Sequence, residues 1–262
     1  MIISLLYHDV VEPGEFSSSG FPGGDANVYK LLRSEFEQHL QALEHAPGRG
    51  NVALLDCAAR EPSSKTLLLT FDDGGASALS IASLLERRGW RGHFLITTDY
   101  IGKPGFLTAD QIRELHARGH VLGSHSCSHP IRMSRCTPTQ LDREWTVSLQ
   151  TLSDIIGERP RVASVPGGYY SRHVAETAAA AGIEVLFNSE PISRLARVAG
   201  CLVLGRHSIQ QGISAHAAAR IAQGAWAPRF RQYLYWNSKK IAKRLGGRYY
   251  LALRKSLLRN AS

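Results

Sequence analysis

The feature that most constrains the fold is an apolar run that ends at two adjacent carboxylates and two glycines. Residues 65–71 read Lys-Thr-Leu-Leu-Leu-Thr-Phe, and Asp72, Asp73, Gly74 and Gly75 follow directly. The run predicts a buried strand, and the glycines let the backbone turn sharply after it. Paired carboxylates at a buried strand end are costly unless a cation or a reaction needs them there. The alternative is an ordinary strand-to-helix turn with Asp73 as the helix N-cap.

A second motif further along the chain favours the metal interpretation. His125 and His129 follow a predicted strand over residues 120–124. Their i, i+4 spacing is expected to place both imidazoles on one side of a helical turn, close enough to share one metal ion. One carboxylate and two imidazoles give three protein ligands and leave positions for water and substrate, as a catalytic zinc-type site requires. A lone histidine on such a face would more often be a structural residue than a ligand.

Predicted strands and helices alternate along most of the chain. Strands are expected over residues 1–7, 52–55, 66–71, 92–97, 120–124, 161–165, 183–187 and 201–205. Helices are expected to begin at Ser34, Thr108, Thr137 and Ser214 and to cover residues 76–88 and 171–181. The alternation predicts a parallel, barrel-like α/β sheet. The candidate chemical residues all follow strands, where the active face of such barrels lies.

The two motifs together resemble the first two signature motifs of the polysaccharide deacetylases, the NodB-homology or carbohydrate esterase family 4 enzymes. The resemblance rests on residues 70–74, residues 125–129 and the intervening segment 106–112, and it covers roughly residues 1–220. It implies a distorted, incomplete (β/α) barrel. It also implies that Asp72 is the catalytic base and that Asp73, His125 and His129 hold a divalent metal, with zinc the first choice.

The reaction implied by this resemblance is metal-dependent removal of an acyl group, N-acetyl first, from a sugar in cell-envelope or exopolysaccharide synthesis. The substrate would be a glycan or a lipid-linked sugar. Two alternatives stay open at this point. One is a family member that hydrolyses a non-sugar amide, and the other is an inactive relative that only binds metal or glycan.

The third family motif, Arg-x-Pro, is altered in this chain. The matching residues are Ser164-Val165-Pro166-Gly167-Gly168-Tyr169-Tyr170. By the resemblance, Pro166, Gly167 and Tyr169 would contact substrate or the oxyanion, with the Gly167 N–H as a donor. Ser164 stands where the arginine that orients the base is normally found. Arg161 or Arg206 are the candidates to replace that arginine.

Two further histidines are weighed for roles in the site. The last family motif supplies a general acid after a late strand, and His207 follows the predicted strand 201–205. We therefore assign it the general acid role, with a surface histidine as the alternative. His8 follows the first predicted strand, where it could line the mouth of the site, although a structural hydrogen bond is the simpler interpretation. Asn188 and Glu190 are assigned no role.

Positive charge is concentrated at the C-terminal end. The chain has 262 residues and a formal net charge of +9, and no Asp or Glu follows Glu190. We divide it into a deacetylase-like domain, residues 1–224, and a basic, aromatic-rich helical tail, residues 225–262. Such a tail suits an anionic membrane surface, and a helix packed on the barrel is the alternative. Nucleic acid is disfavoured because no recognition motif accompanies the charge.

The remaining features bound the cellular setting. The four cysteines are scattered without Cys-x-x-Cys pairs, which indicates a reduced, cytoplasmic environment. No stretch approaches the roughly 20 apolar residues of a membrane span. The apolar start, residues 1–7, lacks a basic segment before it, so we interpret it as a strand rather than a signal peptide. Peripheral association with the inner membrane face is compatible with these features.

Overall fold

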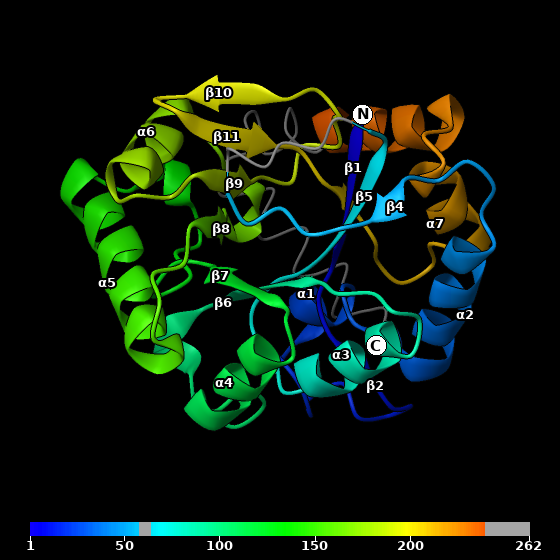
Figure 1. The fold of residues 1–262 in the computed structure, drawn as a ribbon, viewed down its shortest axis with the longest axis horizontal. Coiled ribbons are helices and arrows are strands. Elements are labelled where there is room, and N and C mark those ends of the chain that lie inside the picture. The colour runs from blue at the N-terminus through cyan, green and yellow to red at the C-terminus, as the bar shows by residue number, and fades with distance from the viewer. Residues whose placement is uncertain (58–63, 239–262) are drawn as a thin grey trace.

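The computed structural model describes residues 1–57 and 64–238, and within them one curled sheet is wrapped on its outer side by helices (Figure 1). The strand order is β10 (Ala196–Val198), β11 (Cys201–Leu204), β9 (Val185–Phe187), β8 (Val162–Ser164), β7 (Val121–Ser124), β6 (His93–Ile96), β5 (Thr66–Phe71), β1 (Ile2–Tyr7) and β12 (His207–Ser208), with β4 (Asn51–Val52) also paired to β5. Of these pairings, only β10 with β11 is antiparallel. Within the described ranges β10 and β12 end the order unpaired with each other, so the expected incomplete (β/α) barrel is confirmed.

The helices that cover the sheet begin and end much as their sequences predict. They are α2 (Arg33–Glu44), α3 (Ala78–Glu86), α4 (Ala109–Ala117), α5 (Pro138–Ile156), α6 (Arg172–Ala180) and α7 (Ala215–Ala222). Thr108 and Thr137 each accept a hydrogen bond from the backbone N–H three residues on, and the glutamine there bonds back to the cap. Ser214 likewise accepts from Ala217 N. These caps satisfy backbone donors that a helix start leaves unpaired, which fixes where each helix begins.

Apolar side chains fill both faces of the sheet. Leu68, Leu95 and Leu202 point into the barrel, where they pack in one buried cluster. On the outer face, the i, i+4, i+7 stripe of α2, which comprises Phe36, Leu40 and Leu43, is fully buried. Burial of each such side chain contributes roughly 1.5–3 kcal/mol. This cluster fills the interior of the barrel, and the candidate chemical residues follow the carboxyl ends of the strands.

Several expected elements differ in detail. The strand expected over residues 52–55 is the two-residue β4, and β10 and β12 were not expected. The long N-terminal loop contains β2 (Val10–Val11), the short helix α1 (Gly24–Asn27) and β3 (Leu31–Leu32), which pairs in parallel with β2. Elements of two to four residues carry too little periodic sequence to be recognised.

The tail is only partly described. Residues 226–238 form a helix, and residues 239–262, which hold most of the expected basic tail, lie outside the described residues. None of the helices in the described ranges combines the length and the apolar character needed to pass through a bilayer.

Candidate active site

The two carboxylates lie where β5 ends, and β5 is paired on its two sides with β1 and β6. Asp72 and Asp73 are buried, with 4% and 8% of their surfaces exposed. Asp73 has φ 76° and Gly74 φ 80°, so the chain turns through the left-handed region directly after the strand. At Gly75 a Cβ would lie 1.9 Å from Asp9 Oδ1, so only glycine fits there. The sequence around the carboxylates thus forms a tight turn that holds both of them at the strand end.

The histidine motif follows β7, but it does not form the expected helical turn. Residues 125–130 contain no helix, and Ser126 and His129 have φ values of 65° and 58°. Side chains satisfy the backbone donors that a helix would have paired internally. The Glu144 carboxylate accepts from Cys127 N at 2.9 Å and from Ser128 N at 2.8 Å. The prediction of a helical turn was therefore wrong, because a buried glutamate on α5 stabilises a loop instead.

The loop nevertheless brings both imidazoles to Asp73. His125 Nε2 lies 3.4 Å and His129 Nε2 3.6 Å from Asp73 Oδ1, and ligand atoms of the three residues all lie within 4.8 Å of one another. Asp73 Oδ1 is buried and has no hydrogen-bond partner within the described part of the chain. Three converging ligand atoms, one of them a buried oxygen without a donor, are the arrangement that a divalent cation would complete.

The protonation states of the three residues also suit a cation. Burial lowers the pKa of His125 to about 3 and also lowers that of His129, so both imidazoles are neutral and have a lone pair to donate. Burial, with the neighbouring Asp72 and Asp9, raises the pKa of Asp73 well above its usual range. A positive charge placed between these groups would offset that cost.

Asp72 is held by the buried Arg206, which lies between β11 and β12 and is distant from it in the sequence. Arg206 is 0% exposed, and its two terminal nitrogens donate to Asp72 Oδ1 and Oδ2, each at 2.7 Å. Its Nε donates to Asn188 O at 2.9 Å. Burial alone would raise the pKa of Asp72, but the guanidinium of Arg206 and, less strongly, His125 lower it far below the usual value. Of the two candidates to replace the missing arginine, Arg206 is the one that contacts Asp72, whereas Arg161 pairs with Glu184.

Ser164, which replaces the expected arginine, connects the base to a metal-ligand candidate. Its hydroxyl donates to Asp72 Oδ1 at 3.0 Å and lies 2.5 Å from His125 Nδ1. Because a hydroxyl has one hydrogen, His125 must donate from Nδ1, which leaves its Nε2 lone pair directed at Asp73. Ser164 therefore fixes the imidazole tautomer that metal binding requires.

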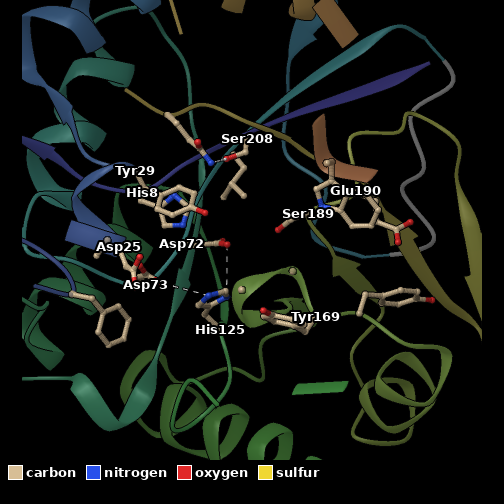
Figure 2. Close-up of a pocket in the computed structure, with 18 of the residues that line it drawn as sticks. His8, Asp25, Tyr29, Asp72, Asp73, His125, Tyr169, Ser189, Glu190 and Ser208 are labelled. Atoms are coloured by element: carbon tan, nitrogen blue, oxygen red, sulfur yellow. Dashed lines mark hydrogen bonds and ion pairs between the residues drawn. The ribbon is translucent and has the colours of Figure 1, made fainter. Parts of the chain in front are cut away.

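A cavity of about 630 Å³ opens over these residues (Figure 2). Its wall includes Asp72, Asp73, His125 and His129 together with Phe21 and Tyr29 from the N-terminal loop and Tyr235 and Trp236 from helix 226–238. His8 also lines it, and in Figure 2 its ring stands beside Tyr29 and faces Asp72. Burial lowers the pKa of His8 to about 4, and the Asp72 charge opposes that shift. His8, for which a structural bond was the simpler interpretation, has an Nδ1 with no hydrogen-bond partner in the described ranges.

The altered third motif lies on the opposite wall of the cavity. Gly167 and Tyr169 line the cavity, and Pro166 is buried behind them at the start of the short 3-10 helix η4 (Pro166–Gly168). Gly167 has φ 60°, which a glycine adopts without strain. In Figure 2, Tyr169 lies across the cavity from His8 and Asp72. Of the three predicted substrate-contact residues, the structure therefore brings Gly167 and Tyr169 to the same cavity as the carboxylates, whereas Pro166 does not line it. Glu190, to which no role was assigned, also lines it.

His207, the residue predicted as general acid, does not line this cavity. In β12 it pairs with Leu5, which packs in the outer core, whereas Ser208 pairs with Leu6, and both of these line the cavity. Side chains alternate along a strand, so His207 points to the outer side. There its Nδ1 contacts Gln232 Oε1 at 3.0 Å, and burial lowers its pKa to about 4. The sequence pattern placed His207 after a strand, but the residue belongs to the short strand β12 itself.

Comparison with known proteins agrees with this geometry. Residues 59–186 match the family model for polysaccharide deacetylase. The chain is 26% identical over 219 residues to YxkH of Bacillus subtilis (strain 168), whose name assigns it to the polysaccharide deacetylases; this covers 81% of the chain and 73% of YxkH. It is 30% identical over 124 residues to the chitooligosaccharide deacetylase of Bradyrhizobium sp. (strain ANU 289), which covers 46% of the chain and 54% of that protein.

The fold also has a counterpart among solved structures. The Streptococcus pyogenes deacetylase PplD, solved in complex with acetate, superimposes with a TM-score of 0.66 at 20% identity, over 82% of this chain and 94% of that chain. At this identity the likeness concerns the fold, a curled α/β half-barrel. With the matching family model and relatives, the motifs around Asp72 and His125 show that the chain belongs to the polysaccharide deacetylase family, the NodB-homology proteins.

Proposed function

We propose that the protein is a metal-dependent hydrolase that removes an acyl group, N-acetyl first, from a sugar. The observation that carries the proposal is the convergence of Asp73, His125 and His129 beside the separately held carboxylate of Asp72. A metal site and an ionised base next to each other are the arrangement that metal-assisted hydrolysis of an amide uses. The deacetylase family of the chain and the chitooligosaccharide deacetylase among its relatives support a sugar substrate.

In this proposal the metal is held by Asp73 and by Nε2 of His125 and His129, and zinc suits one carboxylate and two imidazoles. A divalent cation supplies Lewis-acid activation of the acyl carbonyl and of water when bound there. Asp72 removes the proton from the attacking water, and Arg206 keeps its carboxylate ionised and oriented. Gly167, positioned by the buried Pro166, receives the oxyanion at the cavity wall, and Tyr169 contacts the sugar ring.

The proton must then reach the leaving nitrogen, and we propose His8 for this step in place of His207. His8 lines the cavity on the side of Asp72, and its pKa of about 4 means that it starts neutral at pH 7. It accepts the proton that Asp72 has taken from water and gives it to the nitrogen as the carbon–nitrogen bond breaks. Asp72 then returns to its carboxylate form and His8 to its neutral form, so the next cycle starts from the same state.

The substrate we propose is a glycan or a lipid-linked sugar presented at a membrane surface during envelope or exopolysaccharide synthesis. Two observations support this choice. The cavity is bounded on one side by helix 226–238, and no acidic residue follows Glu190. We therefore infer peripheral association of residues 225–262 with an anionic membrane, at its inner face.

The test of the proposed function is acetate release from water-soluble N-acetylated oligosaccharides after chelation and after addition of Zn²⁺. We expect release only with the metal restored, because the proposed hydrolysis needs the cation as the Lewis acid that activates the acyl carbonyl and the water. An acetylated peptide amide is the control for the alternative substrate class. Stoichiometric metal binding without release from any substrate would instead indicate an inactive, binding relative.

Separate substitutions of His8 and His207 distinguish their roles. We expect His8→Gln to lower kcat by about 10²–10⁴-fold, because glutamine cannot carry a proton to the leaving group. His207→Gln should leave kcat nearly unchanged, since that side chain lies outside the cavity, and should affect only thermal stability. Both variants should bind one metal ion, measured by titration. Loss of activity in His207→Gln alone would restore the original assignment.

A further inference from the structure

Helix 226–238 is oriented with its polar side toward the barrel and much of its apolar surface toward solvent. Arg229 donates to Ser193 Oγ at 2.7 Å, and Gln232 donates to Ser208 O at 2.9 Å as well as contacting His207. These contacts attach the helix to the end of the sheet beside the cavity. A helix that only completed a soluble domain would bury its apolar stripe instead.

The exposed face carries a helical stripe of large apolar side chains. Trp226, Phe230, Tyr233 and Leu234 are 71%, 39%, 43% and 52% exposed, and they follow the i, i+4, i+7, i+8 spacing of one helix face. We call these four residues the aromatic stripe. Trp226 and Phe230 stack with ring centroids 4.7 Å apart, so these two residues of the stripe form one continuous aromatic surface. Single exposed apolar residues are ordinary on proteins, but four on one helix face are not.

The charge of the sequence that includes and follows the aromatic stripe indicates what covers it. Residues 239–262 follow the helix in the sequence, and they hold eight Lys and Arg and no Asp or Glu. Arg231 is exposed on the helix itself. Exposed aromatic side chains followed in the sequence by concentrated positive charge suit the boundary of an anionic lipid bilayer, where rings lie at the headgroup level and cations pair with phosphates.

The position of the aromatic stripe relative to the cavity gives this surface a function. The same helix contributes Tyr235 and Trp236 to the cavity wall, one and two residues beyond Leu234. A membrane bound at the stripe would therefore lie beside the cavity mouth. We propose that the aromatic stripe docks the enzyme on an anionic membrane surface, so that the cavity mouth meets sugars carried at the headgroup level. The statement about sugars rests on the proposed function, whereas the docking itself does not.

Flotation of the full chain with vesicles tests the docking. We expect the protein to float with vesicles of phosphatidylglycerol mixed with phosphatidylcholine and to bind phosphatidylcholine vesicles much less. The variant Trp226→Ser/Phe230→Ser/Leu234→Ser should lower the partition into the mixed vesicles by about tenfold or more, because three apolar side chains leave the interface. Trp226→Ser alone should lower it severalfold. Val147→Ser, at a 40% exposed site on α5, is the matched control and should float like wild type.

Acetate release from a soluble oligosaccharide separates this inference from the proposed function. The substituted residues do not line the cavity, so all of these variants should release acetate at the wild-type rate if the proposed function holds. Unchanged flotation of the triple variant would overturn the docking proposal whether or not the protein is active. Failure of wild type to float, with a wild-type dimer that the triple variant converts to monomer, would overturn it in favour of a second copy on the aromatic stripe.

Discussion

Replacing Asp72 with asparagine should lower kcat for deacetylation by about 10²–10⁴-fold while one metal ion still binds. The amide keeps the shape of the side chain but cannot take a proton from water. Asp73, His125 and His129 are unchanged, so the ligand set that we propose for the metal is intact. Steady-state acetate release and metal titration on the same preparation measure the two quantities.

Two controls make this result interpretable. The Asp72→Asn variant leaves the buried Arg206 without its carboxylate partner, which lowers the stability of the fold. The assays should therefore be run well below the measured Tm of the variant. Asp142→Asn removes an exposed carboxylate at the start of α5 and should behave as wild type. Turnover by Asp72→Asn within a few-fold of wild type would exclude Asp72 as the base and leave its role structural.

The parts of the site that the sequence predicts are those encoded within one short segment. The run before Asp72 and the five residues from His125 to His129 each carry their signal locally, and each follows a strand of a parallel sheet. Parallel strands bring such ends to one edge, so the convergence on Asp73 followed from the fold class. The helical turn predicted for His125–His129 was wrong because Glu144, distant in sequence, caps that loop.

The parts that the sequence does not predict depend on strand order. β1 lies between β5 and β12, so His8 faces the same cavity as Asp72, and the turn after β11 brings Arg206 to the base. Nothing in the local pattern around either residue specifies that order. For His207 the ambiguity was one of register, because one position along β12 decides whether a side chain faces the cavity or the outer core.

The family pattern left open which of Arg161 and Arg206 replaces the missing arginine. The Arg-x-Pro motif carries a serine at its first position, and Ser164 contacts Asp72 only through its hydroxyl. The Arg206 guanidinium nevertheless reaches the base from the segment between β11 and β12. The positive charge that keeps Asp72 ionised thus comes from Arg206 after β11 instead of from the Arg-x-Pro motif. A comparison of aligned motifs alone would count the arginine as missing.

Arg206→Met should lower the free energy of unfolding of the metal-free protein at pH 7 by about 3–5 kcal/mol, because it leaves a buried carboxylate without its partner. It should also lower kcat, since nothing else holds both oxygens of Asp72 within the described part of the chain. Arg161→Met is the matched control. Its side chain is 45% exposed and pairs with Glu184 at the surface, so its cost should stay within about 1 kcal/mol.

The pH dependence of this loss identifies its electrostatic origin. In wild type the pKa of Asp72 is lower folded than unfolded, so the pair contributes stability above the unfolded value of about 3.9, and that stability is lost as the pH falls toward the folded value. Without Arg206, burial raises the pKa of Asp72, and the variant loses stability as the pH rises and the carboxyl ionises. The difference between wild type and Arg206→Met should therefore widen from pH 4 to pH 7 in urea unfolding. A difference that stays constant over this range would mean that Arg206 acts through packing against Phe187 rather than through its charge.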